Sequence, residues 1–166
     1  IHHNVGLGFF VPELTPLGDC VKDGARDIGR AIGVPEILLT RHPFPGPGLI
    51  VRIEGEVTRV KLTMARMLDE IYIDELRTAG LYDSVWQAGI TVTQSMHTWT
   101  KGDYAGIGPL VMYWAVWSVN GFTARAAHFP PEFHDRLCQR IGNEVPGVGA
   151  VSERKSRKPF STIEIG

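Results

Sequence analysis

The sequence predicts an α+β fold, in which two helices cover a small β-sheet and a short N-terminal α/β remnant precedes them. A long stretch of helical periodicity stands before the middle of the chain, and apolar strand-like runs follow it. A second helical stretch separates these runs from the C-terminus. Elements in this order pack as layers around one core. The 166 residues, 43% of them hydrophobic and 21% charged, suffice for such a core without cross-links.

The first part of the chain predicts little regular structure. Residues 1–16 are rich in Gly and Pro, and we expect a loop there. Apolar residues at helical spacing between positions 21 and 32 predict a helix, which Gly33 and Pro35 end. Residues 49–53 predict a short strand.

The remaining elements follow in the same way. Apolar spacing over residues 57–80 predicts a long amphipathic helix that ends at a glycine. Residues 85–93 and 110–119 predict strands, and the second is apolar enough to be buried. Residues 130–141 begin with two prolines and predict a helix. Residues 160–165 predict a final strand.

The loop at residues 41–49 reads Arg-His-Pro-Phe-Pro-Gly-Pro-Gly-Leu. Proline removes a hydrogen-bond donor and fixes φ, so this stretch cannot continue a helix or lie inside a sheet. Gly46 and Gly48 permit a close backbone approach to a ligand. The composition fits either a stiff ligand-contacting loop or a simple connector between domains.

Charge and cysteine content argue against several kinds of partner and binding site. The net charge of −1 gives no case for nucleic acid or an anionic membrane as a partner. Cys20 and Cys138, both expected in helices, fit reduced core thiols better than a disulfide, and we expect a cytoplasmic protein. The adjacent pair His2-His3 lacks a third ligand at a useful spacing, so we expect no metal site.

The amino-acid sequence of the proline loop resembles that of one protein family. The stretch His42-Pro43-Phe44-Pro45-Gly46-Pro47-Gly48-Leu49 is similar to the junction that opens the C-terminal dimerisation domain of GMP synthetases. Further matches follow in the family's order over almost the whole chain. They are His2-His3-Asn4-Val5-Gly6, Lys22-Asp23, Arg30, Gly33, Val51-Arg52, Gly55-Glu56-Val57, Asp74-Glu75-Leu76-Arg77, Gly80-Leu81-Tyr82-Asp83, Gln87-Ala88, Asn143-Glu144-Val145-Pro146-Gly147, Lys158-Pro159 and Thr162-Ile163-Glu164.

The resemblance implies a domain organisation and a reaction. Residues 1–41 would be the tail of an ATP-pyrophosphatase domain, with part of its lid near His2-His3, and residues 42–166 would be the dimerisation domain. Such enzymes activate the C2 oxygen of XMP with ATP, and ammonia from a glutaminase domain then displaces AMP. ATP and magnesium would bind in the ATP-pyrophosphatase domain rather than in this segment, and the partner in solution would be a second copy of the chain.

The two chemical steps need residues that this sequence lacks. Adenylation requires a Ser-Gly-Gly-X-Asp-Ser type loop whose backbone N–H groups cradle pyrophosphate, and these 166 residues contain none. Neither Cys20 nor Cys138 stands in a nucleophile-elbow context. We therefore expect no catalytic residue in this segment, and no activity from it alone.

The resemblance does imply residues that hold XMP. In the family the proline-glycine loop, a strand Gln, a Gly-Asp turn and a C-terminal Lys with Thr-Ile-Glu reach the nucleotide. A lysine can offer a point charge to phosphate, and a glutamate can accept from ribose hydroxyls or base N–H groups. On a strand, residues 162 and 164 would share one face while residue 163 faces the core. The residues concerned are Gly46, Pro47, Gly48, Gln87, Asp103, Lys158, Thr162, Ile163 and Glu164.

Departures from the family leave two functions open. Met96, Ala105 and Trp114 stand where family members usually carry arginines, and Glu153-Arg154 replaces a Tyr-Asp pair. Losing guanidiniums removes bidentate contacts that lysine cannot replace. The chain is then either the XMP-binding, dimerising part of a GMP synthetase or a divergent dimerisation module that no longer binds nucleotide. In both cases we expect a homodimer through the sheet of residues 85–93, 110–119 and 160–165.

Overall fold

The computed structural model describes residues 14, 16–20, 22–119 and 121–165. Two compact units divide the chain, Ile1–Gly46 and Pro47–Gly166, and each is described by itself. The assignment of residues 1–41 to an ATP-pyrophosphatase tail remains a prediction. The pair His2-His3 and nearly all of the predicted loop over residues 1–16 lie outside the described residues.

The first unit contains two helices. The predicted first helix is confirmed as α1 (Lys22–Ala31), and a short α2 (Glu36–Leu39) follows Gly33, which has a φ of 82°. A Cβ on Gly29 would lie 2.7 Å from Cδ2 of Leu39, so the glycine lets α2 pack closely on α1.

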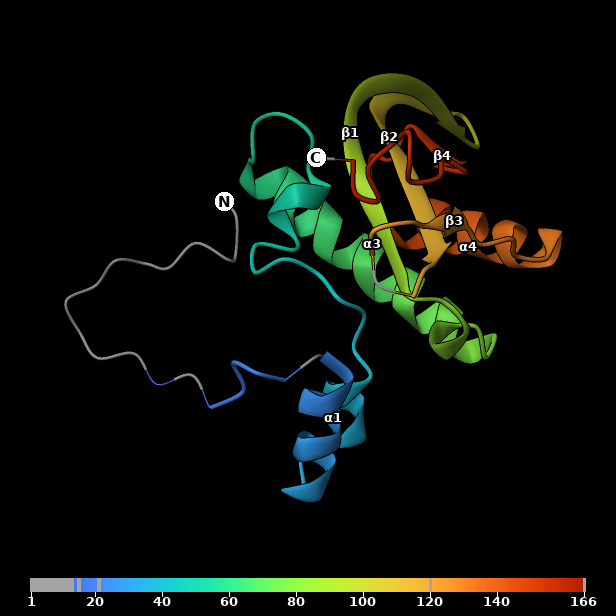
Figure 1. Cartoon of the computed structure of the whole chain (residues 1–166). Coiled ribbons are helices and arrows are strands. Elements are labelled where there is room, and N and C mark those ends of the chain that lie inside the picture. Colours follow the sequence, from blue (N-terminus) through green and yellow to red (C-terminus); the bar gives the residue numbers. More distant parts are fainter. Residues whose placement is uncertain (1–13, 15, 21, 120, 166) are drawn as a thin grey trace. The chain divides into compact units, whose positions relative to one another are not determined.

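The second unit is the α+β layer structure that the sequence predicts (Figure 1). Its sheet is a long antiparallel pair, β1 (Gln87–Lys101) and β2 (Tyr104–Trp117). Two short strands pair with β2, antiparallel β3 (Arg125–Ala126) and parallel β4 (Ala150–Glu153). Two α-helices cover the sheet, α3 (Arg59–Thr78) and α4 (Pro131–Glu144). Two 3₁₀ helices complete the unit, η1 (Ile50–Arg52) and η2 (Tyr82–Ser84).

The core lies between the helices and one face of the sheet. Alternate residues of β1 and their partners on β2 belong to this core, as the pleat of a strand requires. Both helices supply a buried apolar stripe to this core. The buried positions on the helices are Met64, Ala65, Leu68, Ile71, Tyr72, Leu76, Phe133, Leu137 and Ile141.

A bulge divides the long hairpin into a buried and an exposed half. The pairing of β1 with β2 shifts between Val92 and Met96. The hydroxyl of Thr93 fixes the bulge, because it donates to the carbonyl of Leu110 (2.9 Å) and accepts from the N–H of Ser95 (3.2 Å). Residues before the bulge are buried, and most residues after it are exposed. The exposed half, which comprises residues 94–109, is called the hairpin arm below.

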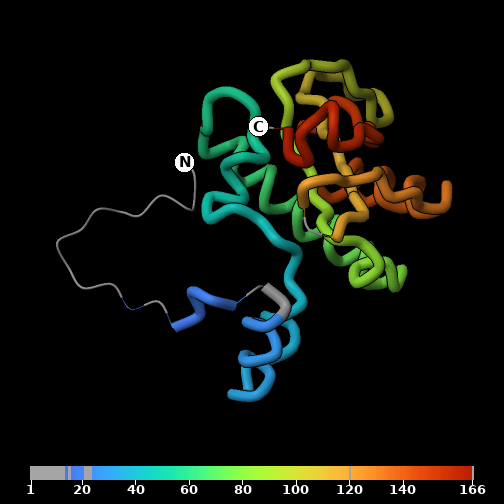
Figure 2. The backbone as a smooth tube through the Cα atoms, in the orientation of Figure 1, coloured from blue at the N-terminus to red at the C-terminus, as the bar shows by residue number. Residues whose placement is uncertain are grey.

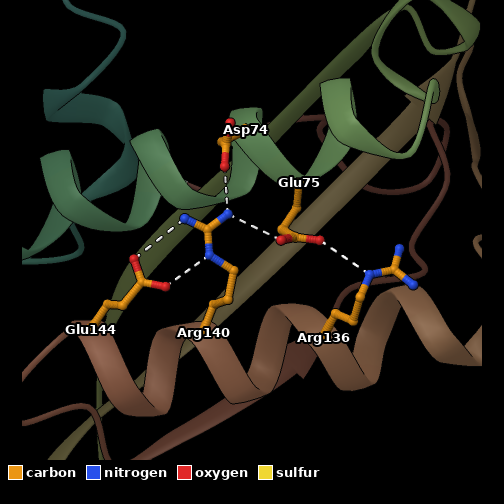
Figure 3. Close-up of polar contacts among 5 residues, drawn as sticks. All are labelled: Asp74, Glu75, Arg136, Arg140 and Glu144. Carbon is orange, nitrogen blue, oxygen red and sulfur yellow. Dashed lines mark hydrogen bonds and ion pairs between the residues drawn. The ribbon is translucent and has the colours of Figure 1, made fainter.

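A charged network joins the two long helices (Figure 3). Arg140 on α4 donates to Glu75 (3.0 Å), Asp74 (2.5 Å) and Glu144 (2.8 Å), and Arg136 donates to Glu75 (3.4 Å). Glu75 is only 6% exposed, so its charge would be costly without these two arginines. The hydrogen bond from Arg140 is the main reason why the pKa of Glu144 is lowered.

Two predicted strands are wrong. Residues 49–53 contain the 3₁₀ helix η1, in which the N–H of Ile50 bonds the carbonyl of Pro47 (2.9 Å), and only Ile53 bridges the sheet. Residues 160–165 form turns and bends, because Pro159 offers no N–H to a ladder and side chains hold the segment instead. Because this segment is not a strand, the expectation that residues 162 and 164 share a strand face is also wrong. The sheet has two additional strands, β3 and β4, which the sequence did not predict.

The cysteines are both free, but they are not both core residues. Cys20 is exposed and precedes α1, whereas Cys138 lies on α4 and is half-buried. Among the described residues, no helix combines the length and the apolar character that crossing a membrane needs.

Candidate functional site

The C-terminal segment, residues 154–165, lies beside the sheet at the red end of the chain (Figure 2), and one arginine holds its irregular part. Arg154 Nη1 donates to the carbonyl of Ile163 (2.7 Å), and Nη2 donates to the carbonyl of Thr162 (2.8 Å) and to the hydroxyl of Ser161. Burial lowers the pKa of Arg154, but an arginine starts high enough to stay charged at neutral pH. Its planar fork therefore fixes three successive residues, two of which were predicted to touch substrate.

The same segment reaches Gln87 at the start of β1. Gln87 Nε2 donates to Oε1 of Glu164 at 2.9 Å, and Gln87 is 2% exposed. The Thr162 hydroxyl donates to the carbonyl of Glu164 at 2.5 Å. A carboxylate offers about four acceptor positions, so Glu164 can accept further hydrogen bonds beside Gln87. The structure thus brings Gln87, Thr162, Ile163 and Glu164 together, although they are up to 77 positions apart.

Arg52 links the proline-glycine loop to the same face of the sheet. Its Nε donates to the carbonyl of Gly48 at 2.8 Å, and its guanidinium pairs with Asp69 of α3. A Cβ on Gly89 would lie 3.3 Å from Cδ of Arg52, which shows how closely this side chain covers the strand next to Gln87. Arg52 is 6% exposed, so it positions the loop from within the structure.

Sequence reasoning did not assign Arg52 or Arg154 to the site. Arg52 entered only as part of a family motif, and Arg154 only as a departure from the family pattern. Both arginines stand in stretches that are otherwise apolar or turn-forming. An arginine that is buried in such a stretch needs hydrogen-bond acceptors, and this could have marked both as structurally important. The acceptors are backbone carbonyls of distant or irregular segments, which no local pattern reveals.

Lys158 lies on the same face but further along the sheet. Its backbone exchanges two hydrogen bonds with Ala124, of 2.9 and 3.0 Å, beyond the edge of β3. The pairing puts it three strand spacings of ~4.8 Å from Gln87, with a shift of two residues along the strands, so the two backbones are roughly 16 Å apart. Lys158 Nζ donates to the carbonyl of Gly121 at 2.9 Å.

A pocket of about 490 Å³ adjoins Lys158, within the size range of small-molecule sites. Its walls come from the end of β2, the loop before β3, β3 itself and the segment around Lys158. Three of the lining residues carry positive charge, and none carries negative charge. The lining residues are Trp117, Ser118, Val119, Thr123, Ala124, Arg125, Arg157, Lys158 and Pro159.

Within a single chain, the predicted residues Asp103, Gly46 and Pro47 do not belong to the group formed by Gln87, Thr162, Ile163 and Glu164. Asp103 is exposed at the tip of the hairpin arm, where Gly102 has a φ of 59°, as the first position of a type II′ turn requires. Gln87 lies at the opposite end of β1. Gly46 ends the first unit, while Pro47 begins the second, where the Pro47 carbonyl caps η1.

The positions that lack the family's arginines differ in environment. Met96 is 59% exposed on the hairpin arm, and Ala105 is exposed there as well. Trp114 is 2% exposed and packs against Gly89, where a Cβ would lie 2.8 Å from the indole. Trp114 thus fills the space beside Gly89, on the strand that begins at Gln87.

A second polar cluster surrounds Cys138 on α4. Cys138 Sγ lies 3.4 Å from Nε2 of His134, whose Nδ1 lies 2.8 Å from the hydroxyl of Tyr113. Burial, and then the charge of Asp135, raise the pKa of the Cys138 thiol, which lowers its thiolate fraction at neutral pH. The described residues contain no group of three or more His, Cys, Asp or Glu that could hold a metal ion.

Comparison with known proteins identifies similar sequences. The family model described as GMP synthase C terminal domain matches residues 74–165. The chain is 43% identical over 166 residues to the glutamine-hydrolyzing GMP synthase of Chlorobium luteolum, and 46% identical over 169 residues to that of Aquifex aeolicus. The enzyme of Zymomonas mobilis is 40% identical over 169 residues. Each alignment covers 98% of this chain, which spans only about a third (32%) of the length of these relatives.

Proposed function

Since this chain belongs to the GMP synthase C-terminal domain family, we propose that it supplies one wall of an XMP site and a homodimer contact to the conversion of XMP to GMP. The chain spans about a third of its relatives (32%), so the reaction itself needs groups from elsewhere. ATP, magnesium and the adenylation step belong to an ATP-pyrophosphatase domain in this proposal, and ammonia comes from a glutaminase domain. A cytoplasmic location is part of the same proposal.

The observation that carries the XMP proposal is the hydrogen-bonded pair of buried Gln87 and partly exposed Glu164. A primary amide and a carboxylate at 2.9 Å present donor and acceptor groups side by side, which suits the N–H and carbonyl groups of a xanthine ring. Arg154 holds the backbone of residues 161–163, so Glu164 is positioned before any ligand arrives.

Lys158 completes the proposed wall at its other end. It shares a face with Gln87 at a backbone separation of roughly 16 Å, by three strand spacings and a shift of two residues. Long side chains that reach inward from both ends shorten this span to a length that a nucleoside monophosphate can bridge. The base would lie toward Gln87 and the phosphate toward Lys158, with Thr162 and Ile163 near the ribose.

The hairpin arm is the surface we propose for the homodimer. The sequence suggested residues 85–93, 110–119 and 160–165 as the interface, and most of residues 85–93 and 110–116 are covered by their own chain. On the hairpin arm, by contrast, Met96, Ile107 and Tyr104 are 59%, 67% and 78% exposed. An isolated two-stranded ribbon is marginally stable in water, and a second copy would cover these apolar side chains.

Calorimetric titration with XMP tests the nucleotide proposal. The protein to be titrated is a chimera in which this chain replaces the matching third of the Aquifex aeolicus relative. The rest of that relative supplies the other wall of the proposed XMP site. We expect Glu164→Gln to weaken XMP binding about 10- to 100-fold, the value of one charge-assisted hydrogen bond. The matched control is Glu70→Gln, at an exposed position of α3.

Two results would count against the proposal. Equal XMP affinity in the parent chimera and Glu164→Gln would favour a divergent dimerisation module without nucleotide binding. A chimera that binds XMP as tightly as the intact relative after deletion of residues 160–166 would exclude the C-terminal segment from the site altogether.

A further inference from the structure

A hydrogen-bond relay connects Cys138 on α4 with Glu153 on β4. Cys138 Sγ lies 3.4 Å from Nε2 of His134, and Nδ1 of His134 lies 2.8 Å from the hydroxyl of Tyr113. The Tyr113 hydroxyl is also hydrogen-bonded to the side chain of Glu153, which pairs with Lys155 at 3.2 Å. Side chains from α4, β2 and β4 thus meet in one relay that ends at a thiol.

The Tyr113 hydroxyl fixes the tautomer of the His134 ring. A carboxylate only accepts hydrogen bonds, so Tyr113 donates its single hydroxyl proton to Glu153. The hydroxyl oxygen then accepts from the Nδ1–H of His134, which leaves the lone pair of Nε2 to accept from the Cys138 thiol. A nucleophile, a base and a group that orients the base therefore stand in the order that activates a thiol.

Cys138 is half-buried and lines a pocket of about 520 Å³. The pocket lies between the end of β1, the last turn of α4 and the loop before β4. Lys101 is the one charged residue in its described lining, and the side-chain amides of Gln139 and Asn143 stand beside it. The Lys101 ammonium makes a long contact of 3.4 Å with the carbonyl of Gly142. A small ligand that carries carboxylate and amide groups matches this lining.

We propose that Cys138 is a site of covalent modification by small carboxylate-bearing disulfides, which bind in this pocket and leave a mixed disulfide on the thiol. Burial raises the pKa of the thiol, so the resting group is S–H and its reaction needs a base. His134 is that base, and Tyr113 is a positioning residue that acts through His134.

The exchange balances without a further reactant. Cys138 Sγ gives its proton to Nε2 of His134 and attacks one sulfur of the bound disulfide. The bond between the two sulfurs of the ligand breaks as the new S–S bond forms. The departing thiolate takes the proton from His134 and leaves as a thiol, so Cys138 is oxidised and the departing half of the ligand is reduced.

The modification site is independent of the proposed XMP wall. Tyr113 and Ala115 of β2 belong to the core between the sheet and the helices. Gln87 pairs with Val116, the next residue, whose side chain points to the opposite face of the sheet. The two proposals can therefore fail separately.

Mass spectrometry of the full chain with oxidised glutathione tests the proposal. Cys20→Ser leaves Cys138 as the single thiol, and we expect this variant to gain one glutathione while it is folded. In the same background, His134→Gln should lower the second-order rate constant about 100-fold, the value of a general base. The matched control is His128→Gln, an exposed histidine outside the relay, which should leave the rate unchanged.

A second disulfide tests recognition by the pocket. Lys101→Gln should slow the reaction with oxidised glutathione about 2- to 5-fold, the value of one exposed ion pair. The same substitution should leave the reaction with the uncharged 2-hydroxyethyl disulfide unchanged. Equal slowing with both disulfides would contradict recognition of the carboxylates.

The nitrogen NMR signals of the His134 ring test the role of Tyr113 without relying on activity. In the Cys20→Ser chain we expect a protonated Nδ1 and an unprotonated Nε2. Tyr113→Phe should give a mixture of tautomers and slow the modification about 10-fold. A protonated Nε2 in the parent ring would show that His134 is not oriented as a base.

Two rate measurements would overturn the inference. One is a folded Cys20→Ser chain that gains no glutathione, or gains it only in urea that unfolds the protein, while Cys20 in a Cys138→Ser chain reacts. The other is a His134→Gln variant that reacts as fast as its parent, because the thiol would then need no base.

Discussion

Single arginines do much of the positioning in this chain. Arg154 replaces a strand ladder for residues 161–163, and Arg52 ties the Gly48 carbonyl to the sheet. Arg140 holds three carboxylates between the two long helices. In each case a planar group with several fixed donors satisfies acceptors that are distant in sequence. This is why substituting lysine at these positions would not be conservative.

The Arg140 network makes stability depend on acid pH. Its hydrogen bond lowers the pKa of Glu144 below the ordinary value of about 4.3. A carboxylate with a lowered folded-state pKa stabilises the fold above its unfolded pKa, and this contribution is lost as pH falls through the lowered value. We therefore expect the free energy of unfolding of Glu144→Gln to fall less than that of the parent between about pH 5 and pH 3.

Urea unfolding at several pH values measures this difference. Glu132→Gln, on the first turn of the same helix, is the control, and its acid profile should follow the parent. Identical acid profiles for the parent and Glu144→Gln would mean that Arg140 does not contribute through this carboxylate.

The crossing of the hairpin arm and the segment before β4 is a packing constraint between elements. A Cβ on Gly108 would lie 1.8 Å from the carbonyl oxygen of Gly147, so backbone would have to move. We expect Gly108→Ala to lower the free energy of unfolding by about 1–3 kcal/mol, the usual cost of overpacking. Gly142→Ala, in α4 with nothing within 4 Å of the new methyl, should raise it by about 0.5–1 kcal/mol.

Urea denaturation of the two variants measures both changes. Their opposite signs matter, since both replace a glycine by the same residue. A Gly108→Ala variant as stable as the parent would show that the two segments do not cross as closely as described.

Elements with strong local patterns were predicted well. The amphipathic helices over residues 57–80 and 130–141 correspond to α3 and α4, and the apolar runs at 85–93 and 110–119 lie within or next to β1 and β2. The strands of the hairpin arm pair with each other and leave most of their side chains exposed, so their sequence has no apolar alternation. Both strands therefore extend further than the sequence predicted. β4 and the irregular C-terminal segment depend on contacts with β2 and with Arg154, which are tertiary.

The candidate site was only partly accessible from sequence. The resemblance supplied Gln87 and Glu164, and the structure joins them by a hydrogen bond. Composition gave no means of finding the pair, because a strand Gln and a near-terminal Glu are ordinary residues.

At the scale of the whole molecule, the hairpin arm predicts self-association. Sedimentation at micromolar concentration should give roughly twice the chain mass, because a second copy would cover the exposed Tyr104 and Ile107. The double substitution Tyr104→Ser and Ile107→Ser should shift the protein toward monomer. A parent chain that sediments as a monomer would remove the dimer proposal.

The central claim is that residues at the start of β1 and in the C-terminal segment meet to hold a nucleotide. The most direct measurement is the NMR signal of the Gln87 side-chain amide during an XMP titration, with the exposed Gln139 amide as the internal reference. The account predicts that the Gln87 signal moves with XMP and that the Gln139 signal does not. An unmoved Gln87 signal at XMP concentrations that shift other residues would contradict it.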